Sequence, residues 1–349
     1  MKSTKIRKDL TTGSIPKQLF ALMIPFMFSN ALQVLYSTID MVIVGKYVGT
    51  AGLSAVSQSS AILNFATMIC LGFANGGQVV IGQALGAGKK QETNNIIGTL
   101  FTVILLMGLA FSGVIIALKD VVIKVMNIPT ESVTMSSDYL VICGMGMIFT
   151  AGYNMVSATL RGMGDATRPL LFIAIASAVN LGLDILFTGY WGWGVAGAAW
   201  ATIIGQAVSF LFSLYYLYRN KKEFGFDFKP ASFKPVKKFV KMIVSLGTPM
   251  AIQSGFINIS MLYVNSMINS IGVVESATFG VGVRIDDIMN KISMGIQYAA
   301  LPMISQNIAA KELKRSQKIV YWAWIYSGIF YDYIPDTLYL LRQRIVYDV

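Results

Sequence analysis

The sequence predicts an all-α polytopic membrane protein, and three observations lead to this fold class. Of the 349 residues, 55% are hydrophobic and only 13% are charged, whereas a soluble domain carries about a quarter charged residues. The mean hydropathy is +0.61. The apolar residues also come in long blocks, and blocks of about 20 apolar residues are typical of membrane-spanning helices.

Nine such blocks follow one another along the chain. The first is too long for the core of a signal peptide and no cleavage site follows it, so we expect it to stay as a first helix. Several blocks exceed the length that a bilayer requires, which predicts tilts or kinks. The expected spans cover residues 17–44, 53–81, 95–118, 137–159, 168–188, 193–218, 242–270, 276–306 and 317–334.

An internal repeat sets the order of these spans. Residues 19–97 resemble residues 243–320, so that Pro25 lines up with Pro249 in the second copy. Membrane proteins built from two like halves are commonly transporters, with the substrate path between the halves. The sequence therefore predicts two six-helix bundles related by a parallel repeat.

The second bundle is expected to be incomplete. Two repeats need about 446 positions, and the chain has 349. The ninth block also meets Asp332 and Pro335, which suit a lipid-facing helix poorly. A frameshift or an early stop would give such a tail, and a short form that completes its bundle by self-association is the alternative. The expected domains are a first bundle at 1–218, a basic cytoplasmic linker at 219–241 and a partial second bundle at 242–349.

The basic charge predicts orientation. The formal net charge is +11. If the N-terminus is cytoplasmic, 21 basic residues of the termini and loops lie inside and only Lys46, Lys119 and Lys124 lie outside, in agreement with the positive-inside rule. The charge is thus explained by orientation in a lipid bilayer, and we expect no nucleic-acid partner.

Several function classes find no support in the sequence. Cys70 and Cys143 both lie in apolar spans and there is no histidine, so neither a disulfide framework, a metal site nor the residues of a membrane enzyme are expected. The glycine-rich string that ends at Lys89 has Gln83 where a phosphate loop needs glycine, and Lys90 where it needs Ser or Thr. We therefore expect no nucleotide, no cofactor and no enzyme activity.

Polar residues inside the spans are spaced so that each set falls on one face of its helix. A single polar stripe usually serves hydrogen bonding between helices, but five stripes together favour a wet central cavity. The stripes consist of Asn30, Gln33, Ser37 and Asp40; Ser57, Ser60, Asn64 and Thr67; Thr150, Asn154 and Ser157; Ser177, Asn180 and Asp184; and Thr202, Gln206 and Ser209.

Two of these stripes carry a carboxylate. An aspartate at the centre of a membrane helix costs about 3 kcal/mol on insertion scales, and neither Asp40 nor Asp184 has a Lys or Arg nearby in the sequence. Such residues usually have a task in ion or proton transfer. The alternative is a structural acid that is hydrogen-bonded to Asn, Gln or Tyr.

The ordered motifs resemble the multidrug and toxic compound extrusion (MATE) transporters over about residues 10–330. The matching segments are Tyr36-Ser37-Thr38-Ile39-Asp40-Met41-Val42 after Pro25, Gly82 to Gly88, Leu160-Arg161-Gly162-Met163-Gly164-Asp165, Asn180-Leu181-Gly182-Leu183-Asp184, and Gly197 to Thr202 with Gln206.

This resemblance implies an antiporter of a bacterial cytoplasmic membrane that exports small cationic or amphipathic compounds in exchange for H⁺ or Na⁺. Its ion-coupling residues fall on Asp40, Asp184, Asn180, Asn154 and Thr202, and we expect Gln33, Tyr36, Ser37, Asn64 and Gln206 to line the cavity. A flippase for lipid-linked precursors is the alternative, although it would need basic residues for phosphate inside the spans. We expect the 349-residue product to be inactive because its second bundle is partial; the substrate and the choice of coupling ion stay open.

Overall fold

The computed structural model describes residues 7–329 except 127 and 272, and this part of the chain is built from helices and loops without a strand. Six of its helices are long and apolar enough to cross a membrane, or seven if one bent pair counts as a single span. The prediction of an all-α membrane protein is therefore confirmed. The count of nine spans stays a prediction, since residues 330–334 of the ninth lie outside the described residues.

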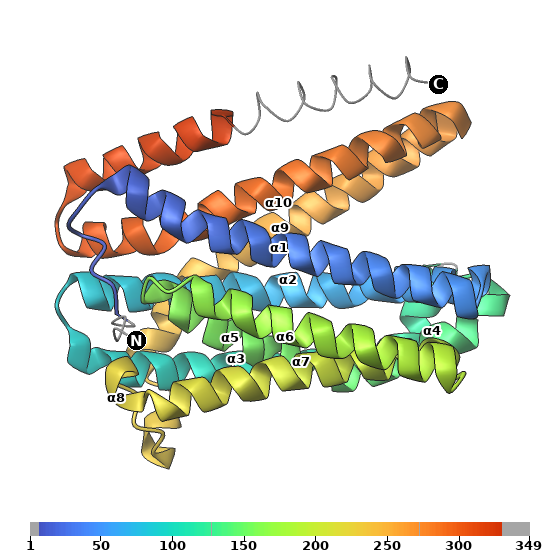
Figure 1. The fold of residues 1–349 in the computed structure, drawn as a ribbon, viewed down its shortest axis with the longest axis horizontal. Coiled ribbons are helices and arrows are strands. Elements are labelled where there is room, and N and C mark those ends of the chain that lie inside the picture. Colours follow the sequence, from blue (N-terminus) through green and yellow to red (C-terminus); the bar gives the residue numbers. More distant parts are fainter. Residues whose placement is uncertain (1–6, 127, 272, 330–349) are drawn as a thin grey trace.

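The helices follow one another with short connections (Figure 1). Residues 313–329 form a further helix after α10. The elements are α1 (Ile15–Tyr47), α2 (Thr50–Gly86), η1 (Lys90–Glu92), α3 (Thr93–Val125), η2 (Thr130–Ser132), α4 (Val133–Met145), α5 (Met147–Gly162), α6 (Thr167–Asp184), the π-helix η3 (Ile185–Tyr190), α7 (Gly194–Arg219), α8 (Lys221–Phe224), η4 (Pro230–Phe233), α9 (Lys237–Ile271) and α10 (Val273–Ala309).

Two expected spans are less regular than the sequence predicts. The span expected at 137–159 is divided into α4 and α5, which meet at Gly146 with a bend of 45°. A side chain at Gly146 would collide with Ile203 of α7, so the glycine lets α7 approach the bend. The span expected at 168–188 changes from α-helix to π-helix directly after Asp184.

The sequence repeat is also a repeat of structure. The helices α2 and α10 each have 37 residues, and they are displaced by the 223 positions that relate the two copies. Each is followed by a residue in the left-handed region at equivalent positions, Gly88 with φ 72° and Lys311 with φ 65°. Pro25 in α1 and Pro249 in α9 are also equivalent. The repeat therefore extends to the helix ends and their caps.

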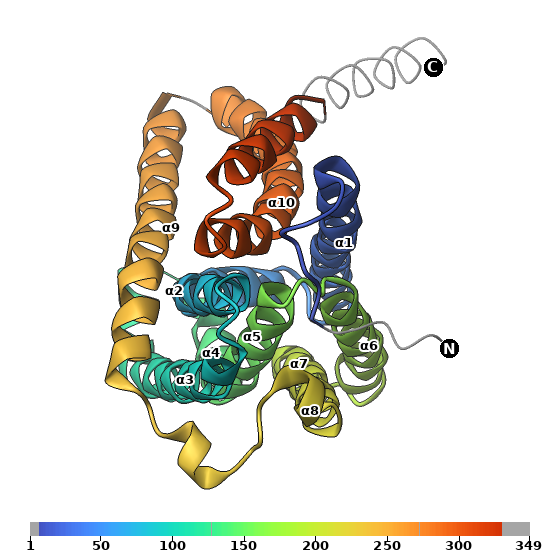
Figure 2. The same ribbon diagram turned by 90° about the vertical axis from the view of Figure 1, so that its left-hand side faces the viewer.

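The two copies are held together by crossed pairs of helices. In Figure 2, α2 lies beside α9, and α10 lies beside both α1 and α2. A Cβ at Gly72 of α2 would lie 2.9 Å from the backbone nitrogen of Ala251, and one at Gly76 would lie 2.8 Å from the carbonyl oxygen of Ile243. These two glycines, four residues apart, let the α2 and α9 backbones touch, as small residues do between membrane helices.

The halves meet mainly at one end of the molecule. We call it the basic end, and it comprises the N-terminal segment that starts at Arg7, η1, and residues 219–236 with α8. There, Leu10 N–H donates to Gln306 Oε1 (3.0 Å), and Asn307 Nδ2 donates to the Leu10 carbonyl (3.0 Å). Arg315 from the helix 313–329 donates to the carbonyls of Gly13 and Thr12. Toward the other end, α9 and α10 run away from α1 (Figure 1).

The expected linker at 219–241 packs on the first bundle instead of hanging free. Phe224 and Phe226 are fully buried, and Phe233 contacts Phe101 of α3 with ring centroids 5.1 Å apart. Thr102 Oγ1 of α3 donates to the Phe233 carbonyl (2.6 Å). The sequence lacks a long apolar run here, but single phenylalanines are sufficient to attach the segment. The domain limits stay a prediction.

Candidate ion-coupling site

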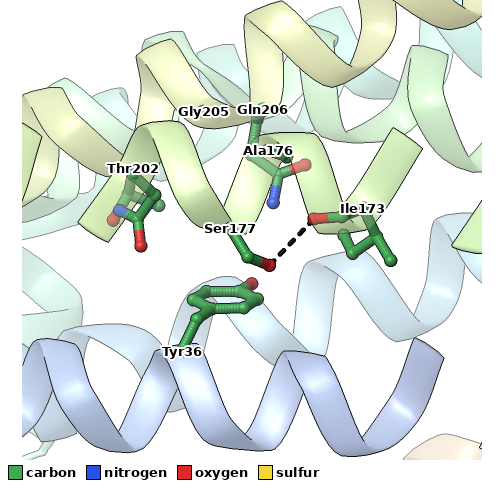
Figure 3. Close-up of a pocket in the computed structure, with 8 residues that line it drawn as sticks. Tyr36, Ile173, Ala176, Ser177, Thr202, Gly205 and Gln206 are labelled. Carbon is green, nitrogen blue, oxygen red and sulfur yellow. Dashed lines mark hydrogen bonds between the residues drawn. The ribbon is translucent and has the colours of Figure 1, made fainter. Parts of the chain in front are cut away.

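A small cavity lies inside the first bundle where α1, α6 and α7 meet (Figure 3). The Tyr36 ring of α1 reaches toward α6 and α7, and Ser177 Oγ donates to the Ile173 carbonyl (2.8 Å) beside it. About 10 Å³ is open to the centre of a water molecule, which is room for about one water. The lining residues are Tyr36, Ile173, Ala176, Ser177, Asn180, Thr202, Gly205 and Gln206.

Gly205 brings two walls of the cavity together. A Cβ at this position of α7 would lie 3.1 Å from both the Ala176 carbonyl oxygen and the Asn180 Cβ of α6. The missing side chain therefore lets α7 lie close against α6. As a result, Thr202 and Gln206 of α7 face the same space as Asn180.

The two membrane carboxylates lie next to this cavity. Asp40 is 8% exposed and Asp184 is 1% exposed, and the two side chains interact electrostatically with each other and with Tyr36. Neither forms an ion pair with Lys or Arg among the described residues. The site therefore holds two acids and no compensating cation from that part of the chain.

Several polar atoms of the site are buried without a hydrogen-bond partner of good geometry in the described part of the chain. Buried polar groups normally have such partners, so these atoms keep hydrogen-bonding capacity that a proton or a cation can use. These atoms are Asp40 Oδ1, both carboxylate oxygens of Asp184, both amide atoms of Asn180 and Gln206 Oε1. At poorer geometry, Asn180 still interacts with Asp184, and Gln206 with the Tyr36 hydroxyl.

The π-helix η3 fixes the end of α6 at Asp184. Thr188 Oγ1 donates to the Gly194 carbonyl (3.3 Å), and a Cβ at Gly197 of α7 would lie 2.9 Å from the Phe187 carbonyl carbon. Tyr47 at the end of α1 lies against Gly189. Wider helical turns of this type are frequent at functional sites, and this one fastens the acid-bearing ends of α1 and α6 to α7.

The structure thus brings together six of the ten residues selected from the sequence. Tyr36, Asn180, Thr202 and Gln206 line the cavity, with Asp40 and Asp184 at its side. The other four do not line this cavity: Asn154 and Gln33 are half-buried, and Ser37 and Asn64 are exposed. Their roles stay predictions. Among the described residues, no group of three or more His, Cys, Asp or Glu side chains could hold a metal ion.

Tyr139 of α4 is a residue of this region that sequence reasoning missed. It is 3% exposed, it interacts electrostatically with Asp40, and its hydroxyl accepts a hydrogen bond from Ser60 Oγ (3.4 Å). A search for amide, hydroxyl and carboxyl stripes passes over tyrosine, which is usually read as an apolar residue with a polar tip.

Comparisons with known proteins identify the family of the chain. The MatE family profile matches residues 25–186 and 249–345. The chain is 30% identical to the probable multidrug resistance protein YpnP of Bacillus subtilis over 309 residues, which are 88% of this chain and 68% of YpnP.

Solved structures share the fold. A crystal structure of MATE in the straight conformation superposes with a TM-score of 0.90 at 23% identity, covering 99% of this chain and 77% of that one. An outward-facing multidrug resistance MATE transporter of the MOP superfamily gives a TM-score of 0.85 at 24% identity, covering 93% and 71%. The repeat, the intramembrane acids and the matched segments lead to one conclusion: the chain belongs to the MatE family, the MATE multidrug efflux transporters.

Proposed function

We propose that the protein works as a secondary antiporter in which Asp40 and Asp184 form the ion-coupling site. The observation that carries this proposal is the pair of buried carboxylates that lacks a cation in the described part of the chain. Two ionised carboxylates repel each other in a medium of low dielectric constant. A proton or a Na⁺ ion bound at the pair removes that repulsion.

The location of the pair supports coupling to a conformational change. Asp40 and Tyr36 belong to α1, which packs on α6 in the first bundle and on α10 in the second half. A change in the charge between α1 and α6 therefore alters a helix that also contacts the other half. Ion binding and movement of the halves are linked in this way, as exchange requires.

The cargo that we propose is a small cationic or amphipathic compound. Acids near the transport path attract cations, and the cavity lining includes no Lys or Arg that would bind a phosphate. A flippase for lipid-linked phosphates is therefore disfavoured. The similarity to bacterial proteins supports a location in a bacterial cell membrane, and the charge distribution supports a cytoplasmic basic end.

Proton binding tests the coupling role directly. Purified protein in weak buffer with a pH indicator receives tetraphenylphosphonium, a lipophilic cation, and the released protons are counted. We expect release at pH 7 that disappears in the double variant Asp40→Asn, Asp184→Asn. Proton release that persists in this variant would show that neither acid belongs to the coupling site. NaCl in place of tetraphenylphosphonium shows whether Na⁺ competes for the same pair.

Orientation has its own test. Lys222→Cys, in a background without Cys70 and Cys143, should react with an impermeant thiol reagent only after cells are permeabilised, because α8 belongs to the basic end. Labelling in intact cells would reverse the proposed topology.

We also propose that residues 1–349 do not transport when no further helices complete the second bundle. Alternating access needs two stiff bundles, and among the described residues the second half offers only α9, α10 and the helix 313–329. Expression in a pump-deficient bacterium should leave resistance to cationic dyes unchanged. A rise that depends on the ion gradient would contradict this and would favour self-association.

A further inference from the structure

Arg161 is a buried cation at the boundary between the two halves. It lies in the last turn of α5 and is 7% exposed. In the sequence Arg161 falls among the basic loop residues that orient the chain, but the structure places it inside the protein. Because arginine stays protonated in proteins, this burial keeps a full positive charge out of water.

The direct partners of Arg161 are uncharged and come from its own half. Its Nε donates to Gln78 Oε1 (2.9 Å) and its Nη2 donates to Asn75 Oδ1 (3.2 Å), both on α2. It forms no ion pair with any described residue, and the nearby Asp165 is paired with Arg168. Two amides hold the guanidinium in place without cancelling its charge.

The cover over Arg161 comes from the other half. The guanidinium carbon lies 5.1 Å from the ring centroid of Tyr298 on α10, and Gln78 Nε2 donates to the Tyr298 carbonyl (3.5 Å). Tyr298 in turn packs on Phe26 of α1 at 6.1 Å between ring centroids. Separation of α10 from α2 at this end would thus remove the ring and admit water to the charge.

We propose that Arg161 biases the two halves toward opening at the basic end, and that Tyr298 is the lid that limits this bias. The proposal rests on the antiport function proposed above, in which the halves open in turn. In the closed form, Arg161 loses hydration that two amides and one ring replace only in part. In the open form it keeps the bonds to Asn75 and Gln78, which share its half, and gains water.

The energetic consequence is that closure at the basic end is kept from becoming too stable. Other contacts favour the closed form, among them the close approach of Gly82 to Ser305 and the hydrogen bonds of Leu10 and Asn307. A charge that is hydrated only on opening works against them. If Arg161 biases the halves toward opening, its replacement should make opening rarer and replacement of Tyr298 should make opening more frequent. If both residues only pack the interface, either replacement should make opening more frequent.

The reactivity of a cysteine at position 305 measures the equilibrium between the closed and the open form of the basic end. Ser305 is 3% exposed on α10 and faces Gly82 of α2, so a cysteine there reacts only when the seam opens. In a background with Cys70 and Cys143 replaced by alanine, Ser305→Cys is labelled with a small maleimide in purified protein. The rate follows the open fraction when opening is fast relative to labelling.

We expect Arg161→Gln to slow labelling about tenfold and Tyr298→Leu to speed it by a similar factor, within the usual range of such couplings. Tyr298→Phe keeps the ring but loses the hydroxyl, which interacts with Asn75 of α2, so it should speed labelling less than Tyr298→Leu does. Arg168→Gln is the matched control, since Arg168 lies at the same end but pairs with Asp165 and contacts Tyr216, both in the first half. Its labelling rate should stay unchanged.

Faster labelling in Arg161→Gln would show that the arginine stabilises the closed form and would overturn the proposal. Equal labelling rates in all variants would also overturn it. A cysteine at the buried Ala158 of the first bundle reports unfolding. If a variant speeds the labelling of this cysteine as well as that of position 305, the variant unfolds the protein, and Arg161→Lys then tests the proposal instead. It keeps the charge, so labelling at least as fast as in the parent supports the bias, and slower labelling overturns it. The readout needs no transport, so loss of antiport activity and failure of this proposal are separable.

Discussion

The Asp40–Asp184 site and the Arg161 site are both buried charges without an ionic partner among the described residues, but they differ in how the charge can be relieved. The acids lie within one half, and a proton or a cation can neutralise them where they are. Arg161 cannot lose its proton, and its cover belongs to the other half. The first site therefore responds to ions, whereas the second responds to movement.

Replacement of one acid should have the largest effect. Asp40→Asn removes the charge while keeping the size and hydrogen-bonding capacity of the side chain. The residue no longer repels Asp184, and the pair no longer binds a proton in competition with the cation. We expect cation-induced proton release to fall at least about tenfold. Val34→Ala, six residues away on α1 and 44% exposed, serves as the control and should release protons normally. Equal loss in both variants would mean that α1 has been disturbed as a whole.

The seam between the halves should be sensitive to volume. Gly76→Leu places a side chain where a Cβ alone would lie 2.8 Å from the Ile243 carbonyl, and overpacking of this kind costs about 1–3 kcal/mol. We expect a lower thermal unfolding midpoint. Gly113→Leu on α3 is the matched control, because no atom lies within 4 Å of its Cβ position. If the two variants unfold alike, the backbone contact does not hold α9.

Loss of one hydroxyl should have a moderate effect. Tyr139→Phe removes the acceptor for Ser60 Oγ and keeps the ring, so we expect a loss of about 0.5–1.5 kcal/mol in unfolding free energy. Chemical denaturation in detergent, with Phe149→Leu as a packing comparison, measures this change. A proton release that vanishes in Tyr139→Phe would place the hydroxyl in the ion path and extend the site to α4.

The attachment of the linker should give the smallest effect, and it depends on pH. Hydrogen bonds from Ser232 Oγ (2.6 Å) and the Lys229 N–H hold the pKa of Asp227 below its usual range. A lowered pKa in the folded protein stabilises it above the unfolded pKa, and this contribution is lost as pH falls through the folded value. Amide exchange of Lys229 should thus rise, relative to its intrinsic rate, below about pH 4. This prediction is contradicted if the ratio of observed to intrinsic exchange rate at Lys229 does not change with pH. It is also contradicted if this ratio at pH 7 is the same in the parent protein and in Asp227→Asn.

The sequence by itself determined the fold class, the repeat and the identity of both acids. These follow from local chemistry: a long apolar block must form a helix in lipid because its backbone has no other partners, and an aspartate within such a block is costly wherever it lies. The spacing of Asn180 and Asp184 on α6, and of Ser37 and Asp40 on α1, places each acid in a polar stripe without reference to any other helix.

Only the tertiary structure decided which stripes meet and which charges are buried. Gly205, Gly72 and Gly76 are ordinary small residues in the sequence, and their effect appears only where a second backbone lies against them. Arg161 stands in a loop-like motif, yet Tyr298, 137 positions later, covers it. Burial depends on helices that are distant along the chain, so no local pattern could separate this cation, closed off from water, from the hydrated ones that orient the protein.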